Sequence, residues 1–309
     1  MWRSLWQARA VRMVAVGARM PTRAMHVSMT RFDAPRAEPM PSAQKVEKTM
    51  QRFWKDVQIA FEEPADDDEH FVVQLDKRSL RTPGGNKLTV PSDRPLLACL
   101  IAQEWDEQTQ VVKPHSLPLT SLVSRAIDGL SEDRTRTDVE EFLMRYFDTD
   151  AVCFHQDQPA ALVKLQKERW VPLIDWARRY LQIPINIAQG TLTHKQPDEA
   201  KAKLTRLLAG LPPLDLAALE RAVMTSKSMI IGLALVHRHI EAEQAALAAE
   251  VETAAQASTW GAIDDSHDVD HAELRRQLAS CACAQVSTES GLVEKFVTVL
   301  RQRGGAFRT

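Results

Sequence analysis

The spacing of hydrophobic residues changes near Ser92, and this change limits the folds open to the chain. Before it, residues 57–61 alternate hydrophobic and polar side chains, and residues 71–75 are rich in β-branched and aromatic side chains. Both patterns are typical of strands. After it, hydrophobic residues recur at helical spacing to about residue 302. The sequence predicts an α+β protein, with a small antiparallel β-rich N-terminal domain followed by a mainly α-helical C-terminal domain.

Turn-forming residues refine the strand prediction. Residues 79–82 and 87–90 flank the turn sequence PGGN, which favours folding one strand back on the other. Ser92 and Asp93 have the side chains that cap helix starts. The segment 150–154 is predicted to be extended.

Helices are expected wherever the helical periodicity persists. The predicted segments are 92–110, 118–131, 134–147, 158–182, 196–210, 213–225, 227–239, 241–258, 264–284 and 288–302. Pro172 is expected to kink the helix at 158–182, because hydrophobic periodicity continues beyond it.

The N-terminus has the composition of a mitochondrial transit peptide. Six arginines precede the first acidic residue, Asp33, and alternate with hydrophobic residues. A secretory signal needs a continuous hydrophobic segment of about 7–15 residues, and these arginines divide the N-terminus into shorter ones. The interpretation places the protein in the mitochondrial matrix.

Length and composition then suggest the domain organisation. With 309 residues, of which 44% are hydrophobic, the chain can bury a large core in about two domains. Three prolines between residues 33 and 42 favour an extended linker. The predicted organisation is a transit peptide at 1–32, a linker at 33–45, a β-rich domain at 46–117 and a helical domain at 118–309.

Charge and cysteine content disfavour several function classes. The net charge is −2, and without the six leader arginines it falls to −8, so nucleic-acid binding gains no support. The sequence has no hydrophobic run of about 18 residues that could span a membrane. Four cysteines are too few for a disulfide framework in a chain of this length.

Catalytic motifs are also missing. Gly84 and Gly85 lack the neighbours of a phosphate-binding loop and are interpreted as a turn. The alternative to a non-enzymatic protein is a matrix metal-dependent hydrolase, because Asp264, His267, Asp268 and His271 would share one face of a helix. An acidic first turn that complements the helix dipole is the preferred explanation of these residues, because no His-Glu-x-x-His pattern supplies a base. No cofactor is predicted.

Several short sequences, taken in order, resemble one family. They are RFWKDV at 52–57, LDKRSLRTP at 75–83, LTVPS at 88–92, EWD at 104–106, PLTSL at 118–122, FDTD at 147–150, LQKERWVPL at 165–173, KSM at 227–229, WG at 260–261 and HD at 267–268. Together they resemble the assembly chaperones of the mitochondrial ATP synthase catalytic head, the Atp-twelve family.

This resemblance implies a function without catalysis. It implies that the chain binds and shields the unassembled alpha subunit of the ATP synthase until the beta subunit replaces it, and that it acts as a monomer. An acidic residue before the Trp-Gly pair is important in the family. By position the match is Glu252, with Glu250 as the alternative, and Trp260 is the third predicted client-binding residue. A structural subunit that stays in the finished complex is a further alternative.

Overall fold

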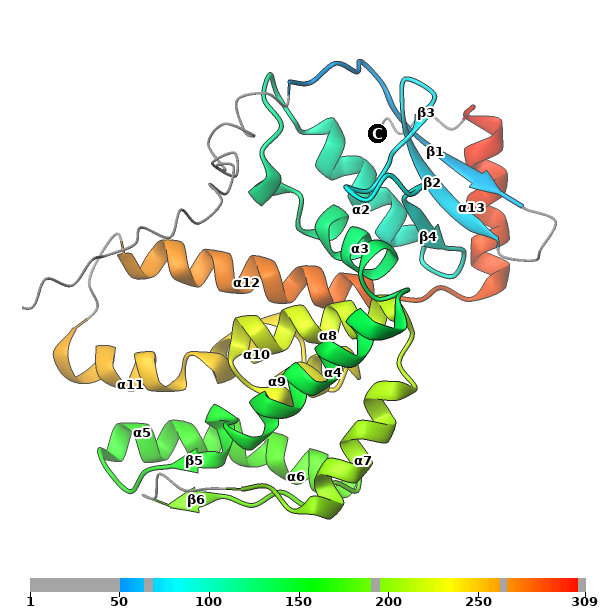
Figure 1. Ribbon diagram of the computed structural model, residues 1–309. Helices are drawn as coiled ribbons and strands as arrows, with labels where there is room; N and C mark the ends of the chain where they lie inside the picture. The colour runs from blue at the N-terminus through cyan, green and yellow to red at the C-terminus, as the bar shows by residue number, and fades with distance from the viewer. Residues whose placement is uncertain (1–50, 64–68, 190–194, 262–265, 305–309) are drawn as a thin grey trace, which may run out of the picture. The chain divides into compact units, whose positions relative to one another are not determined.

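The N-terminal sheet is built around one central strand. In the computed structural model, the described residues are 51–63, 69–189, 195–261 and 266–304. The central strand β2 (His70–Leu75) pairs antiparallel with β1 (Val57–Glu62) on one side, and with β3 (Arg78–Ser79) and β4 (Thr89–Pro91) on the other. Because Ile59 is aligned with Val73, hydrophobic side chains of β1 and β2 share one face. The predicted antiparallel sheet is confirmed (Figure 1).

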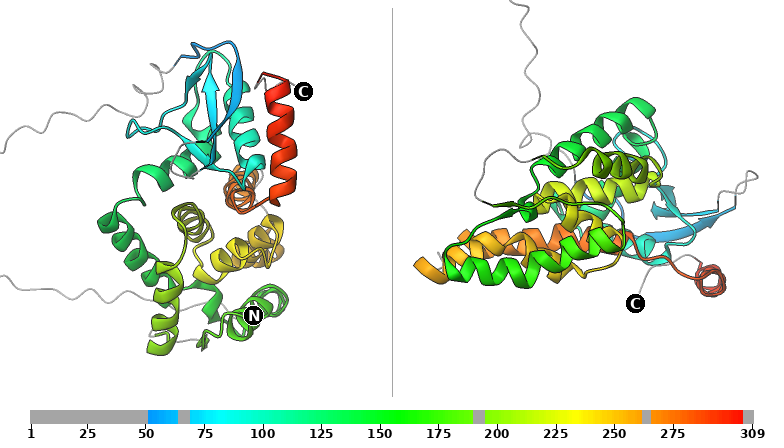
Figure 2. Two further views of the ribbon diagram at one scale, coloured as in Figure 1. Left: turned by 90° about the vertical axis from the view of Figure 1, so that its right-hand side faces the viewer. Right: turned by 90° about the horizontal axis from the view of Figure 1, so that it is seen from below.

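Two helices distant in sequence contact this sheet. The helix α2 (Pro95–Asp106) packs against β1 and β2, and the last helix, α13 (Ser290–Gln302), returns to β1. The ring of Phe296 on α13 lies 5.6 Å from the ring of Phe71 on β2. Figure 2 shows α13 beside the strands. The C-terminal end of the described chain therefore completes the N-terminal sheet region.

The predicted cap of the first helix is wrong. Ser92 and Asp93 lie before the helix, and Arg94 occupies the capping position without a side-chain cap. Proline at the first helical position needs no capped N–H and already has a helical φ. The helix therefore begins at Pro95.

Helices make up most of the remaining structure, as predicted. They are α3 (Pro118–Asp128), α4 (Asp133–Asp148), α5 (Ala160–Leu165), α6 (Val171–Arg179), α7 (Asp198–Ala209), α8 (Pro213–Ser226), α9 (Met229–Val236), α10 (Ala242–Ala249), α11 (Val251–Trp260) and α12 (Ser266–Ala284). Short 3-10 helices cover Pro114–Ser116 and Ala151–Cys153.

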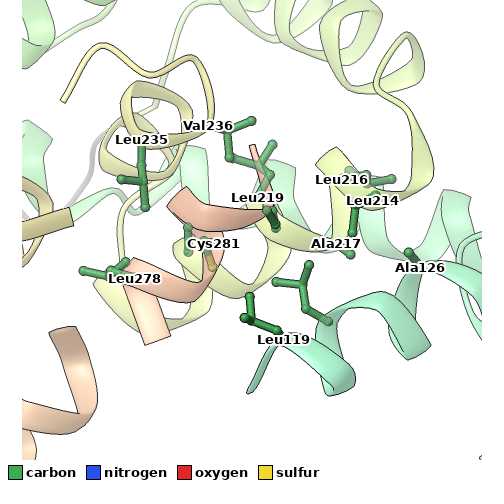
Figure 3. Close-up of a cluster of buried hydrophobic side chains, with 14 of the residues drawn as sticks. Leu119, Ala126, Leu214, Leu216, Ala217, Leu219, Leu235, Val236, Leu278 and Cys281 are labelled. Atoms are coloured by element: carbon green, nitrogen blue, oxygen red, sulfur yellow. The ribbon is translucent and has the colours of Figure 1, made fainter. Parts of the chain in front are cut away.

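The helical core forms where α3, α8, α9 and α12 meet. Figure 3 shows hydrophobic side chains from these four helices turned toward one another. Every residue of α9 is buried. A Cβ on Gly232 would lie 2.6 Å from Cγ2 of Val223, so glycine permits the close approach of α9 to α8. Burial raises the pKa of the Cys281 thiol to about 12, as expected for an inert core thiol.

The helix predicted at 158–182 continues through Pro172. A π-helical turn, Gln166–Trp170, separates α5 from α6, and Pro172 lies in the first turn of α6. Proline cannot donate a backbone hydrogen bond to the preceding turn, and the wider π-helical turn accommodates this. The side chain of Trp170 is buried here, and its Nε1 donates to the carbonyl of Ala248 at 2.8 Å.

The segment predicted to be extended at 150–154 is mostly helical. Residues 151–153 form a 3-10 turn, and the extended part begins at Phe154 in β5 (Phe154–His155), which pairs in parallel with β6 (Ala188–Gln189). The turn forms because the buried carboxylate of Asp150 accepts the N–H of Val152 at 2.9 Å. The same carboxylate accepts the N–H of Ile230 at 2.9 Å, in the first turn of α9.

The single helix predicted at 241–258 is divided in two. Glu250, with φ −94° and ψ 11°, leaves the helical conformation between α10 and α11. The next helix, α12, packs against α10. Figure 1 shows α10 and α11 as two helices, with α12 above them.

Residues 43–309 form one compact unit. The transit peptide predicted at 1–32 and the linker predicted at 33–45 lie outside the described residues, and the boundary between residues 117 and 118 stays a prediction. In the part of the chain that the structure describes, no helix has the length and hydrophobicity to cross a membrane.

Candidate functional site

An open groove lies between α5 and α11. Its volume is about 550 Å³. The residues that line it are Gln156, Gln158, Pro159, Leu162, Glu252, Ala255, Gln256 and Trp260. Glu252, Gln256 and Trp260 are four residues apart, and this spacing places them on one face of α11. We call this site the α11 groove. It brings together two of the three predicted client-binding residues.

Trp260 differs in exposure from the other tryptophans among the described residues. Trp54, Trp105 and Trp170 are buried, and Trp176 is half-buried against the ring of His239. The side chain of Trp260, by contrast, is 80% exposed. A large aromatic side chain left in water at the rim of a groove is typical of a protein-binding surface.

Glu252 offers an unopposed negative charge in the same groove. It lies in the first turn of α11 and is exposed. Its carboxylate makes no hydrogen bond or ion pair with the residues that the structure describes. Beside it, Gln156, Gln158 and Gln256 supply amide donors and acceptors. The α11 groove therefore combines an acidic group, amides and an exposed hydrophobic ring.

Glu250 has a different environment, although only Val251 separates it from Glu252. Its side chain is buried, and its carboxylate lies 3.1 Å from Nη1 of Arg275 and also contacts Nδ1 of His271 on α12. Arg275 makes a two-pronged pair with Glu243 at 2.8 and 2.9 Å. The hydrogen bonds that Arg275 donates to Glu243, and then to Glu250, raise the pKa of Arg275. Glu250 therefore holds the α10–α11 break against α12.

The residues of the alternative metal site are only partly described. Asp264 and the side chain of His267 lie outside the described residues. Asp268 is exposed, and the imidazole of His271 contacts Glu250. Among the side chains that the structure describes, no three His, Cys, Asp or Glu residues are placed to hold a metal ion.

Sequence reasoning missed the α5 side of the α11 groove. Pro159 and Leu162 lie about 90 residues before α11, so no local pattern links them to Glu252. The proline at the start of the predicted helix at 158–182 was the available signal, and it marks a helix start rather than a binding site. Sequence reasoning also missed Glu104. Its carboxylate accepts N–H groups of Leu119 and Thr120 at 2.7 and 2.9 Å, so the matching sequences at 104–106 and 118–122 form one structural unit.

Comparisons with known proteins agree with the predicted family. Residues 51–178 match the family model described as ATP12 chaperone protein. The mitochondrial protein atp12 of Schizosaccharomyces pombe is 33% identical over an alignment of 242 residues that covers 76% of this chain and 81% of that protein. The mitochondrial ATP12 protein of Saccharomyces cerevisiae is 30% identical over 279 residues, covering 78% and 85% of the two chains.

A solved structure extends the agreement to the fold. The crystal structure of Atp12 from Paracoccus denitrificans is 33% identical and superposes with a TM-score of 0.67, covering 77% of this chain and 98% of that one. Sequence and fold therefore agree over most of the described residues. The chain belongs to the ATP12 chaperone family, and it is a chaperone rather than an enzyme.

Proposed function

We propose that the protein is an assembly chaperone of the mitochondrial ATP synthase catalytic head. It acts in the matrix, where it binds the unassembled alpha subunit and shields it until the beta subunit takes its place. Membership of the ATP12 chaperone family carries this proposal, together with the mitochondrial names of both yeast relatives. The arginine-rich N-terminal composition supports the location.

Shielding has a simple physical basis. A subunit that normally sits between two neighbours exposes a large hydrophobic surface before assembly, and such surfaces self-associate. A binder of moderate affinity keeps the free subunit folded by mass action and can still be displaced by the permanent partner. The chaperone surface must therefore present hydrophobic contact area without binding as tightly as the finished interface.

The α11 groove is the proposed client-binding surface. Trp260 provides the hydrophobic contact, and an aromatic side chain of this size is a frequent source of binding energy at interfaces. Glu252 supplies a charge that pairs with a basic group of the client. Glu250 keeps α11 in place through Arg275 and does not contact the client itself.

A pull-down from mitochondrial extract tests the proposal. The tagged full-length chain is compared with Glu252→Lys, and bound proteins are identified by mass spectrometry. Glu294→Lys on α13 makes the same charge change at another exposed glutamate and is the matched control. We expect the wild type and the control to recover alpha subunit without the rest of the synthase, and Glu252→Lys to recover at least about tenfold less.

Two outcomes would contradict the proposal. If no synthase subunit is enriched, the client assignment is wrong, and the residues 264–271 should then be tested for metal binding. If the protein is recovered in stoichiometric amounts with the complete synthase, it is a structural subunit. If both Lys variants recover equally less alpha subunit, the client assignment stands, but Glu252 is not part of the contact surface.

A further inference from the structure

A second groove lies beside the hairpin that joins β2 to β3, away from the α11 groove. Its volume is about 480 Å³. Its hydrophobic lining consists of Phe53, Trp54, Leu75, Leu80, Trp105 and Val112. Most of these side chains belong to the core, but Phe53 is 67% exposed. We call this site the hairpin groove, and its exposed phenyl ring is the hydrophobic contact it offers to a partner.

All the charge that lines the hairpin groove is positive. Arg78 and Arg81 are exposed at it, and no carboxylate is among its lining residues. Arg81 donates one hydrogen bond, from Nη1 to the carbonyl of Gly85 at 2.6 Å. The guanidinium of Arg78 makes no hydrogen bond or ion pair with the residues that the structure describes. Both arginines therefore keep donors available for an external anion.

The walls of the hairpin groove are fixed by contacts within the protein. Asp76 in the hairpin turn accepts the N–H groups of Lys55 and Asp56 at 3.0 and 2.9 Å, and these hydrogen bonds lower its pKa. Arg52 donates from Nη1 to the carbonyl of Asp106 at 2.8 Å. These contacts tie the segment that carries Phe53 to the hairpin on one side and to α2 on the other. A binding site held in this way loses little entropy when it is occupied.

We propose that the hairpin groove binds an acidic, extended peptide segment of a partner protein. Side chains alternate along an extended peptide, so one face can place aliphatic groups against Phe53 while the other carries carboxylates. Guanidinium groups bind carboxylates through paired hydrogen bonds, and Arg78 and Arg81 are exposed for this contact. A concave hydrophobic lining fits a side chain better than a flat lipid surface. The hairpin groove is thus a second binding surface, basic where the α11 groove is acidic.

Fluorescence anisotropy with the full-length chain tests this proposal. The probe is a short fluorescein-labelled peptide of alternating glutamate and leucine, and the comparison peptide has lysine in place of glutamate. The double variant Arg78→Glu with Arg81→Glu reverses the charge of the groove. Lys77→Glu makes the same type of change at an exposed neighbour that does not line the groove. Phe53→Ser removes the exposed ring, and thermal unfolding checks that each variant is folded.

The expected pattern is a reversal of preference. The wild type and Lys77→Glu bind the glutamate peptide, the double variant binds it at least about tenfold more weakly and prefers the lysine peptide, and Phe53→Ser weakens binding of either peptide. Absence of binding by the wild type, or equal binding of both peptides, would overturn the proposal. So would a loss in Lys77→Glu as large as in the double variant. Arginine-dependent binding to phosphatidylglycerol vesicles in place of the peptide would identify a lipid-binding surface instead.

Discussion

Carboxylates in two regions of this protein have opposite surroundings. At the junctions between helices, Asp150 and Glu250 are buried and hold backbone N–H groups or cations of other elements. In the α11 groove, Glu252 is exposed and has no partner among the described residues. Glu250 and Glu252 show the contrast most directly, because they are separated by one residue. The same side chain is therefore structural at one position and free for recognition at the other.

The difference follows from what each carboxylate would lose on removal. A buried carboxylate leaves its donors without partners, and each unsatisfied buried group costs about 1–3 kcal/mol. When an exposed carboxylate is removed, its neighbours stay in contact with water, and the free energy of unfolding hardly changes. Substitutions at the buried carboxylates should therefore lower the free energy of unfolding more than substitutions in the α11 groove. Substitutions in the α11 groove should instead cause the larger loss of client binding.

The largest loss of stability is expected for Asp150→Ala. The substitution leaves the N–H groups of Val152 and Ile230 without an acceptor inside the core. We expect the free energy of unfolding at pH 5 to fall by about 4 kcal/mol. Urea denaturation followed by circular dichroism measures this loss. If the loss is smaller than the loss caused by replacing an exposed carboxylate with alanine, the junction does not depend on Asp150.

The pH dependence of stability sharpens the role of Asp150. Burial raises the pKa of Asp150 from 3.8 to about 6, although hydrogen bonds from Ser228, Ile230 and Val152 oppose the change. Because the folded-state pKa is raised, the stabilisation is complete below about pH 3.8 and is lost as the pH rises through 6. This change corresponds to about 3 kcal/mol.

Asp150→Asn isolates this contribution, because the amide does not titrate. The difference in the free energy of unfolding between wild type and Asp150→Asn should move by up to about 3 kcal/mol between pH 4 and pH 7, in favour of the variant. Denaturation series at several pH values give the curve. A difference that does not vary with pH would mean that Asp150 has an ordinary pKa in the folded protein.

A smaller loss is expected for Glu250→Ala. The change leaves His271 without this carboxylate and Arg275 with Glu243 as its remaining glutamate. Breaking a fully buried ion pair costs about 3–5 kcal/mol, and since Arg275 is one-third exposed we expect about 2 kcal/mol. Glu243→Ala removes the exposed partner of the same arginine and should cost less than about 1 kcal/mol. Equal costs for the two variants would contradict the buried role of Glu250.

The sequence predicted most of this architecture but not the α10–α11 break. Hydrophobic spacing located the sheet and the helices, because both patterns are local. Residues 241–258 contain no glycine or proline and are rich in alanine, so local propensity favours one continuous helix. The break at Glu250 depends on contacts with His271 and Arg275, which lie more than 20 residues later. Local patterns contain no information about such contacts.

The candidate site was predictable in part for the same reason. The resemblance selected Glu252 and Trp260 by position, and the structure places both in one groove with residues of the α5 segment. Composition could not separate Trp260 from Trp170, because tryptophan occurs in cores as well as at interfaces. Their exposure depends on which face of each helix is covered by another element. For the same reason the roles of Arg78 and Arg81 were not visible in the sequence.

The smallest effect on stability is expected for Trp260→Ala. The indole is mostly in water, so its removal uncovers little hydrophobic surface, and the free energy of unfolding should change by less than about 0.5 kcal/mol. Recovery of the alpha subunit should nevertheless fall at least about tenfold, because an exposed aromatic side chain gains burial only in the complex. Trp170→Ala is the matched control, since its buried ring should cost about 3–5 kcal/mol. If Trp260→Ala destabilises the fold as strongly as Trp170→Ala, its ring is part of the core, and the distinction between the two regions fails.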